Sequence, residues 1–286
     1  MGKLYEAFNR DRIQQLEDSV AATQAESLGP GEIPEQFDFM RYSLGARPML
    51  EGQRSKAPPA AATMSRRSIT LPVTEVGIDL RGVDPHLVAF HHDRRGNDQF
   101  NKLAISLVSK GVEKSFKRVL IASANRGEGR TSVALNLACA LARARQRVLL
   151  VDCDLSNPSV LKLLGARCRV GLQEALAQRP GIAAAVARIT PYGFNILPVL
   201  RPVENPLEIL AAPDFWKTLQ MFDQDYDFVL FDSTPLLAAG DSNLLVRYTD
   251  TTLLVVRPGA TTSTEMARAI APFAQEDLLG VVINRC

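Results

Sequence analysis

The stretch RVLIASANRGEGRTS, residues 118–132, decides the fold expected for this chain of 286 residues. After Arg118, residues 119–124 are apolar or small, and the run 118–124 predicts a buried strand. Residues 131–144 predict a helix. The glycine-rich turn between them leaves backbone N–H groups unshielded by side chains, and the helix dipole adds positive potential. Because a polyphosphate can be held at such a turn, the stretch predicts a nucleotide-binding loop.

This loop is similar to the pattern GxxxxGK[ST] but departs from it at two positions. Ala124 stands at the first glycine position, and Arg130 stands where a lysine would carry a cation to the β and γ phosphates. Arginine keeps the charge but is longer, planar and forked, so the change is not conservative at an enclosed phosphate site. We therefore expect ATP binding to survive and phosphoryl transfer to be depressed. Thr131 is expected to place its hydroxyl on Mg²⁺.

Outward from the loop, short apolar runs alternate with helical stretches. Strands are expected at 118–124, 148–152, 195–200, 228–232, 252–256 and 280–284, and helices at 131–144, 213–222, 240–248 and 263–274. This alternation predicts an α/β fold with a mostly parallel sheet, helices on both faces and right-handed crossovers. Ligands in such sheets bind beyond the carboxyl ends of the strands, so the site residues belong at that edge.

Three aspartates end two of the expected strands at that edge. Asp152 and Asp154 close the run VLLVDCD, and side chains two residues apart on a strand point the same way, so both can approach one metal-bound phosphate. A helix N-cap is the competing interpretation for Asp154. Asp232 ends FVLFD and is expected to organise Mg²⁺ opposite the loop. Thr131, Asp154 and Asp232 are therefore the predicted metal-binding residues.

The chain is predicted to divide at residue 84. Residues 1–83 are expected to hold an amphipathic helix near the N-terminus, followed over about 20–75 by a flexible linker rich in Pro, Ala and Gly. Residues 84–286 are expected to form the nucleotide-binding domain. That domain is predicted to open with an extended piece at 86–90, a polar break at 94–97 and a helix over about 98–109.

Composition narrows the classes of function. The chain has 33 Lys and Arg against 31 Asp and Glu and no basic stripe, so nucleic acid is not expected as a main partner. Its 4 cysteines lack CxxC pairing and a histidine at ligand spacing, which predicts neither a zinc site nor a disulfide framework. Without a secretory signal or an apolar run of about 20 residues, the protein is expected to be cytoplasmic and to meet a membrane only through a partner or a surface helix.

Four segments in order, SANRGEGRTS, VLLVDCDLSNPS, YDFVLFDSTPLL and GVVINR, resemble the bacterial tyrosine kinase family of capsule and exopolysaccharide synthesis, a branch of the MinD/ParA-like P-loop proteins. The resemblance covers about residues 84–286 and implies ATP and Mg²⁺ as cofactors. It implies catalysis by Asp152, Asp154 and Arg130, with one aspartate accepting the tyrosine hydroxyl proton. The residues it assigns to the nucleotide are Arg126, Gly127, Glu128, Gly129, Arg130, Thr131, Ser132, Asn284, which is expected to contact the adenine, and Arg285.

Departures from the family pattern concern assembly and substrate. The helix that usually reads Glu-x-x-Arg-x-x-Arg and drives ring assembly has Asp98, Asn101 and Ala104 here, so ring formation by that route is not expected, although a homo-oligomer stays open. Ser156 replaces the arginine that usually follows the acidic pair. The tyrosines are scattered, and the sequence shows no C-terminal tyrosine cluster as a substrate.

Three functions stay open at this point. The first is an ATP-dependent tyrosine autokinase, and the second is a catalytically weak, nucleotide-dependent regulator of a membrane polysaccharide co-polymerase. In both, the co-polymerase at the inner face of the plasma membrane is the expected partner. A partition ATPase of the ParA or MinD type is less favoured, because Asn125 stands where those proteins carry a second lysine.

Overall fold

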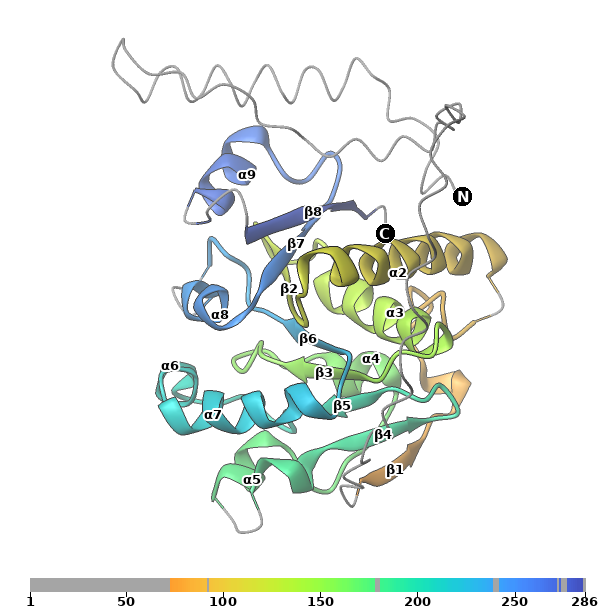
Figure 1. Ribbon diagram of the computed structural model, residues 1–286, viewed down its shortest axis with the longest axis vertical. Coiled ribbons are helices and arrows are strands. Elements are labelled where there is room, and N and C mark those ends of the chain that lie inside the picture. The colour runs from red at the N-terminus through yellow and green to blue at the C-terminus, as the bar shows by residue number, and fades with distance from the viewer. Residues whose placement is uncertain are drawn as a thin grey trace, which may run out of the picture.

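The computed structural model describes residues 73–284, except 92, 178–180, 239–241, 272 and 274–276. The predicted N-terminal helix and most of the predicted linker lie outside the described residues. Within these residues the strands form one sheet of eight, in the order β1-β4-β5-β3-β6-β2-β7-β8. In Figure 1 this sheet runs from β1 at the bottom to β8 at the top. The predicted α/β fold is confirmed.

The strands pair in parallel except at one point, where β4 and β5 are antiparallel. Their bounds are β1 Thr74–Gly77, β2 Arg118–Ser123, β3 Val148–Asp152, β4 Ala187–Thr190, β5 Asn195–Leu197, β6 Phe228–Asp232, β7 Thr251–Val256 and β8 Leu278–Ile283. All six predicted strands are present, with the same bounds for β3 and β6. Neither β1 nor β4 was predicted. Because β1 pairs with β4, the sheet starts before the predicted boundary at residue 84.

Helices cover both faces of the sheet, as predicted. Their bounds are α2 Arg94–Lys114, α3 Arg130–Arg143, α4 Val160–Leu164, α5 Leu172–Ala177, α6 Pro206–Leu210, α7 Pro213–Met221, α8 Ser242–Tyr248 and α9 Ser263–Ile270, with short 3₁₀ turns at Leu80–Gly82, Ile182–Ala185 and Phe222–Gln224. Figure 1 shows α2, α3 and α4 on one side of the sheet and α5 to α9 on the other.

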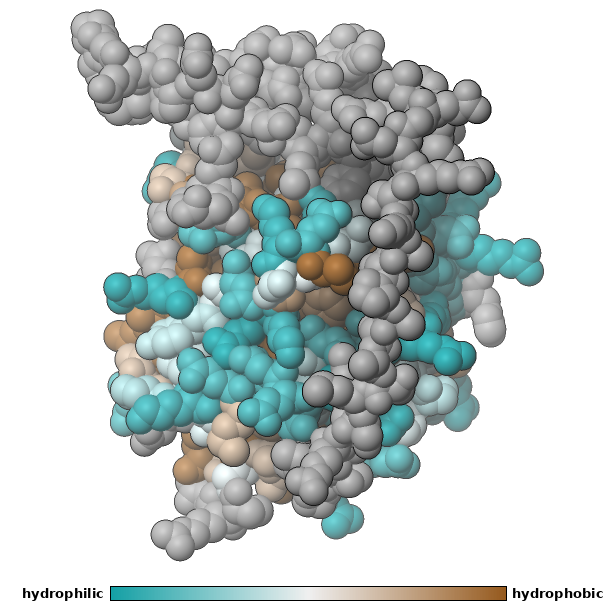
Figure 2. All heavy atoms as spheres, viewed as in Figure 1, coloured by the Kyte–Doolittle hydropathy of each residue, from teal (hydrophilic) through white to brown (hydrophobic). Residues whose placement is uncertain are grey.

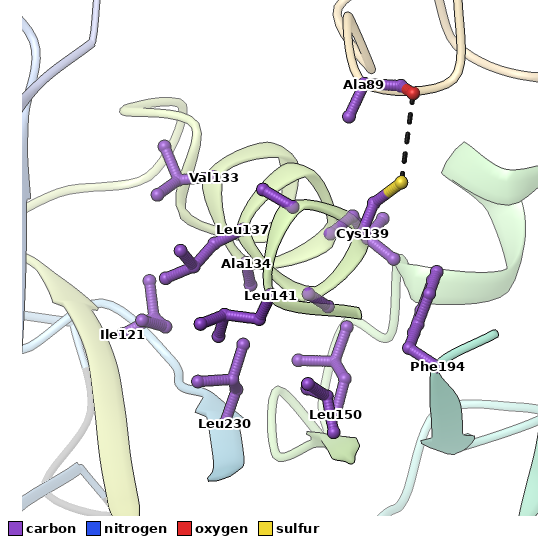
Figure 3. Packing of buried hydrophobic residues seen from close by; sticks show 14 of the residues in the cluster. Ala89, Ile121, Val133, Ala134, Leu137, Cys139, Leu141, Leu150, Phe194 and Leu230 are labelled. Carbon is purple, nitrogen blue, oxygen red and sulfur yellow. Dashed lines mark hydrogen bonds between the residues drawn. The ribbon is translucent and has the colours of Figure 1, made fainter. Parts of the chain in front are cut away.

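The side chains of each buried strand point alternately to the two faces of the sheet and contribute to two hydrophobic cores, one on each face. In β2, Val119 and Ile121 join the core under α2, α3 and α4, whereas Leu120 joins the core under α5 to α9. Successive strand side chains point to opposite faces, so one buried strand serves both cores. Figure 3 shows the first core, where α3 lies against Ile121, Leu150 and Leu230. This two-sided burial anchors the strands whose ends carry the candidate site.

Two predictions for the start of the domain are wrong. The expected extended piece at 86–90 is a series of turns held by Asn136 of α3, whose Oδ1 accepts from the Ala89 N–H at 2.8 Å. The expected polar break at 94–97 is the first turn of α2, because the Asp93 side chain caps that helix. Local polarity indicated a loop, but the capping aspartate makes the same residues helical.

The central strands bring the sequence motifs to one edge. β3, β6 and β2 are neighbours, and in the β3–β6 register Asp152 lies opposite Asp232. The phosphate loop leaves β2 and enters α3 at Arg130. The three motifs therefore meet beyond the carboxyl ends of adjacent strands, where parallel sheets bind ligands.

Candidate functional site

Two glycines shape the phosphate loop between β2 and α3. Gly127 has φ 79° and Gly129 has φ 87°, both in the region that favours glycine. Apart from Gly127 and its two chain neighbours, no heavy atom of the described residues lies within 4 Å of the position a Cβ would take on Gly127, so these residues leave the loop open there. Gly129 is also the N-cap of α3 and supplies no side-chain cap for its first N–H groups. These groups and the helix dipole favour an anion at this point.

Arg130 turns inward and binds protein atoms from three segments. Its guanidinium donates through Nε to the Ser233 carbonyl at 3.0 Å and through one terminal nitrogen to Ser123 Oγ at 2.6 Å and the Asn125 carbonyl at 3.3 Å. The other terminal nitrogen donates to Asp154 Oδ2 at 3.4 Å, and the side chains of this ion pair are 8% and 7% exposed. The residue expected to reach the phosphates thus ties the loop to the ends of β3 and β6.

Asp152 and Asp232 form a buried pair of carboxylates on neighbouring strands. Asp232 Oδ2 accepts from Thr131 Oγ1 at 2.6 Å, and Asp152 Oδ2 accepts from the Val160 N–H at 3.4 Å. Within the described part of the chain, the Oδ1 atom of each is buried and has no hydrogen-bond partner. Burial raises the pKa of Asp232 to about 6. Burial and then the charge of Asp232 raise the pKa of Asp152 well above its ordinary range.

Asp154 occupies a different environment from its neighbour two residues earlier. Its Oδ1 accepts from the Asn157 N–H at 3.2 Å, closing a turn, while its Oδ2 faces Arg130. The N-cap of α4 is Ser159, so the capping interpretation of Asp154 does not hold. Burial raises the pKa of Asp154, and the charges of Arg130 and Arg126 oppose that shift. The acidic pair is thus split, with Asp154 at the arginine and Asp152 at Asp232.

The other half of the loop is held by residues that follow β7 and β8. Glu128 is buried, and its carboxylate accepts from the Asn125 N–H at 3.2 Å and from the Thr261 hydroxyl. Asn284 Nδ2 donates to the Glu128 carbonyl at 3.0 Å, and Arg257 donates to the Gly127 carbonyl at 3.3 Å. Asn284 therefore lies at the loop.

The remaining predicted nucleotide residues lie at or beyond this loop. Arg126 is exposed, and Ser132 is half-buried in the first turn of α3. Arg285 lies outside the described residues.

Ser233 follows β6 in a turn that the sequence suggests as a sensor of the γ-phosphate, and its carbonyl accepts from Arg130. Two other serines at the site, Ser123 and Ser159, were not predicted from the sequence. Ser123 contacts Arg130, and Ser159 Oγ donates to Thr131 Oγ1 at 2.9 Å. Ser123 ends a strand at the predicted ligand edge, a position that could have marked it as a candidate. Ser159 precedes an apolar helical run and would have been interpreted as an N-cap. Its contact with Thr131 depends on tertiary structure.

Among the residues the structure describes, no three His, Cys, Asp or Glu side chains form a cluster able to hold a metal ion. The site instead offers carboxylates in pairs, beside hydroxyls and main-chain donors.

The described helices include none that is both long and apolar enough to cross a membrane. On the face drawn in Figure 2, hydrophilic side chains cover most of the middle of the described part.

Comparison with known proteins assigns the family. The family profile described as "AAA domain" matches residues 116–273, more than half of the chain. Tyrosine-protein kinase YwqD of Bacillus subtilis is 30% identical over 190 residues, which cover 66% of this chain and 80% of YwqD. The chain belongs to the bacterial tyrosine-protein kinase family. The resemblance predicted from the four motifs is confirmed, and the loop described above is the P-loop of this family's nucleotide-binding domain.

Two further comparisons show what share of a related protein's length this chain covers. Tyrosine-protein kinase wzc of Salmonella typhi is 32% identical over 158 residues, which cover 54% of this chain but 22% of wzc. The chain thus spans about a fifth of that relative. The solved kinase domain of Escherichia coli tyrosine kinase ETK superposes with a TM-score of 0.65 at 26% identity, covering 71% of this chain and 81% of that domain. The common part is the P-loop domain.

Proposed function

We propose that this chain binds Mg²⁺-ATP and acts as a tyrosine autokinase of capsule or exopolysaccharide synthesis. The observation that carries the proposal is the meeting of the Thr131 hydroxyl and two buried carboxylates, Asp152 and Asp232, beside an open phosphate loop. Phosphoryl transfer depends mainly on positioning and electrostatic stabilisation, and these are the groups such a site requires.

The donor set fits Mg²⁺. Among the described residues, one buried oxygen of Asp152 and one of Asp232 lack a hydrogen-bond partner, the two residues lie opposite each other, and Asp232 also contacts the Thr131 hydroxyl. Hard oxygen ligands are those Mg²⁺ prefers. A pair of carboxylates is sufficient because Mg²⁺ at nucleotide sites is held by one or two carboxylates together with substrate phosphates. When bound, Mg²⁺ neutralises charge on the transferring phosphate. We therefore propose Thr131, Asp152 and Asp232 as the residues that hold it.

We propose Asp154 as the group that accepts the tyrosine hydroxyl proton. It lies beyond the end of β3, and its electrostatic neighbours include the exposed Arg126, whereas Asp152 is fully buried. Burial raises the pKa of Asp154 toward the range in which a carboxylate is an effective base near neutral pH. This assignment removes Asp154 from the metal site and gives that place to Asp152.

A second candidate function is favoured by the contacts of Arg130. Its donors are engaged with Ser123, Asn125, Ser233 and Asp154, so binding phosphates with this residue requires some of those contacts to be exchanged. A chain that binds nucleotide but transfers the γ-phosphate slowly would act as a nucleotide-dependent regulator. Arg130 is thus the residue on which the two candidates differ.

The experiment incubates the purified full chain with γ-labelled ATP and Mg²⁺ and measures nucleotide affinity by calorimetry. It compares the wild type with Arg130→Lys and Asp154→Asn. Label on tyrosine in the wild type, lost in Asp154→Asn, supports the kinase. Tight binding without transfer, with transfer gained in Arg130→Lys, supports the regulator. Absence of nucleotide binding in the wild type would contradict both.

We further propose a membrane polysaccharide co-polymerase as the partner, at the cytoplasmic face of the plasma membrane. The support is the family to which the chain belongs and the resemblance of its motifs to members of polysaccharide synthesis. Co-expression of the chain with a co-polymerase of the same organism, followed by co-purification from detergent, tests it. Retention that depends on bound nucleotide is expected, and no retention in any nucleotide state would contradict the proposal.

A further inference from the structure

Ser159 uses its hydroxyl in an unusual way for the first residue of a helix. It is the N-cap of α4, a position at which serine normally accepts from an N–H of its own helix, but it makes no such cap. Instead its Oγ donates to Thr131 Oγ1 at 2.9 Å. The hydroxyl is therefore directed out of its own helix and toward the phosphate loop.

Ser159 is the start of a chain of hydroxyl donors that ends on a carboxylate. Thr131 Oγ1 donates in turn to Asp232 Oδ2 at 2.6 Å. An ionised carboxylate can only accept, so Thr131 must give its single proton to Asp232 and accept from Ser159. These two bonds fix the otherwise free rotation of the Thr131 hydroxyl and leave one lone pair of its oxygen for a cation.

The residue after Ser159 contacts the second carboxylate of the pair. The Val160 N–H donates to Asp152 Oδ2 at 3.4 Å, whereas Ser159 is connected to Asp232 through the Thr131 hydroxyl. Oδ2 of Asp152 accepts from Val160 and Oδ2 of Asp232 accepts from Thr131, whereas Oδ1 of each aspartate is buried and has no partner among the described residues. The start of α4 thereby orients the same groups that are proposed to hold Mg²⁺.

We propose that Ser159 is a positioning residue of the cation site, which orients the Thr131 hydroxyl for Mg²⁺ without contacting the nucleotide itself. This inference rests on the Mg²⁺-ATP site proposed above. Groups that hold a metal ligand in place without touching the metal typically change metal affinity by 10- to 100-fold when they are removed. Loss of one neutral hydroxyl belongs at the lower end of that range.

The test measures binding of a non-hydrolysable ATP analogue by calorimetry, with Mg²⁺ and with EDTA. Ser159→Ala is expected to weaken binding about tenfold in Mg²⁺ and to leave binding in EDTA unchanged. Ser159→Thr, which keeps the hydroxyl, is expected to restore the Mg²⁺-dependent affinity. Ser156→Ala is the matched control, because Ser156 lies in the same loop but is exposed. Ser159→Gly removes the hydroxyl while keeping a residue suited to an N-cap, and serves if the alanine variant folds poorly.

Two results would overturn the inference while leaving the proposed site intact. One is a wild type whose affinity depends on Mg²⁺, with Ser159→Ala and Ser159→Gly showing the same dependence. The other is equal weakening in Mg²⁺ and in EDTA, which would mean that Ser159 supports only the fold of the loop. A wild type whose affinity is the same in Mg²⁺ and in EDTA would overturn the Mg²⁺ site itself and this inference with it.

Discussion

The two ends of the phosphate loop are held by different kinds of interaction. At what we term the Arg130 end, a buried guanidinium bonds to Ser123, Asn125, Ser233 and Asp154. At the Glu128 end, a buried carboxylate accepts from Thr261 and Asn125, and Asn284 holds the main chain. Charge is concentrated at the first end, and hydrogen bonds from the segments after β7 and β8 dominate the second.

Within one loop, the groups that can bind phosphate or transfer a proton are therefore separate from the groups that only hold the loop in place. The Arg130 end uses groups that are also candidates for phosphate binding and proton transfer, so ligand binding there competes with contacts that stabilise the fold. The Glu128 end uses Thr261 and Asn284, which bond to Glu128 and not to Asp152, Asp154 or Asp232. We expect the Arg130 end to respond to nucleotide and the Glu128 end to stay in place.

The largest expected effect is on stability when the buried cation is removed. Arg130→Ala leaves Asp154 buried without its ion-pair partner, and breaking such a pair typically costs about 3–5 kcal/mol. Urea unfolding at pH 7 measures the free energy of unfolding. Arg257→Ala, which removes an exposed arginine at the other end of the loop, is the control and should cost less than about 1 kcal/mol. Equal losses in the two variants would contradict the contrast between the ends.

The next effect is a pH dependence that comes from Asp232. Its pKa is raised by burial from 3.8 to about 6, so its contribution to stability is complete below 3.8 and is lost as the pH rises through 6. In the absence of divalent metal, the free energy of unfolding of the wild type should fall by about 2.4 kcal/mol from pH 4 to pH 7 relative to Asp232→Asn. Urea titrations across that range measure it. Parallel profiles for the two proteins would show that Asp232 is not the source.

A smaller effect is expected at the Glu128 end. Thr261→Val removes the hydroxyl that donates to the buried Glu128 carboxylate, and hydrogen bonds to charged groups contribute about 1.5–3 kcal/mol. Thermal and urea unfolding measure the loss. Thr264→Val is the matched control, because Thr264 is exposed on α9 and should change stability by less than about 0.5 kcal/mol. A Thr261→Val protein as stable as this control would mean that water replaces the hydroxyl without cost.

The smallest expected effect is the interaction energy between the two ends, measured as a difference in the free energy of unfolding. Ser123→Ala perturbs the Arg130 end, Thr261→Val perturbs the Glu128 end, and the double variant closes a thermodynamic cycle. If the ends are independent, the interaction energy should lie within about 0.5 kcal/mol of zero. A coupling energy well above that value would show that Asn125, which bonds to both Glu128 and Arg130, joins them into one unit.

The central strands could be predicted because each is a continuous apolar run that is buried on both faces. β3 and β6 match their predicted bounds for this reason. β1 is largely exposed, and β4 has four residues of mixed burial, so neither produces such a run. The short helices α4, α5 and α6 were also missed, because five or six residues are too few to show a helical period.

By itself the sequence determined the order of the six predicted strands and of the longer helices between them, the family, and the positions of the P-loop and its aspartates. These follow from local periodicity and from motifs along the chain. Only the tertiary structure decided the partners. Arg130 meets Ser233 and Asp154 because β2, β6 and β3 are adjacent, and Asp152 faces Asp232 because those strands pair in that register. Ser159 reaches Thr131 across 28 positions of sequence. Contacts between residues so far apart depend on how the sheet brings its strand ends together, which no local pattern encodes.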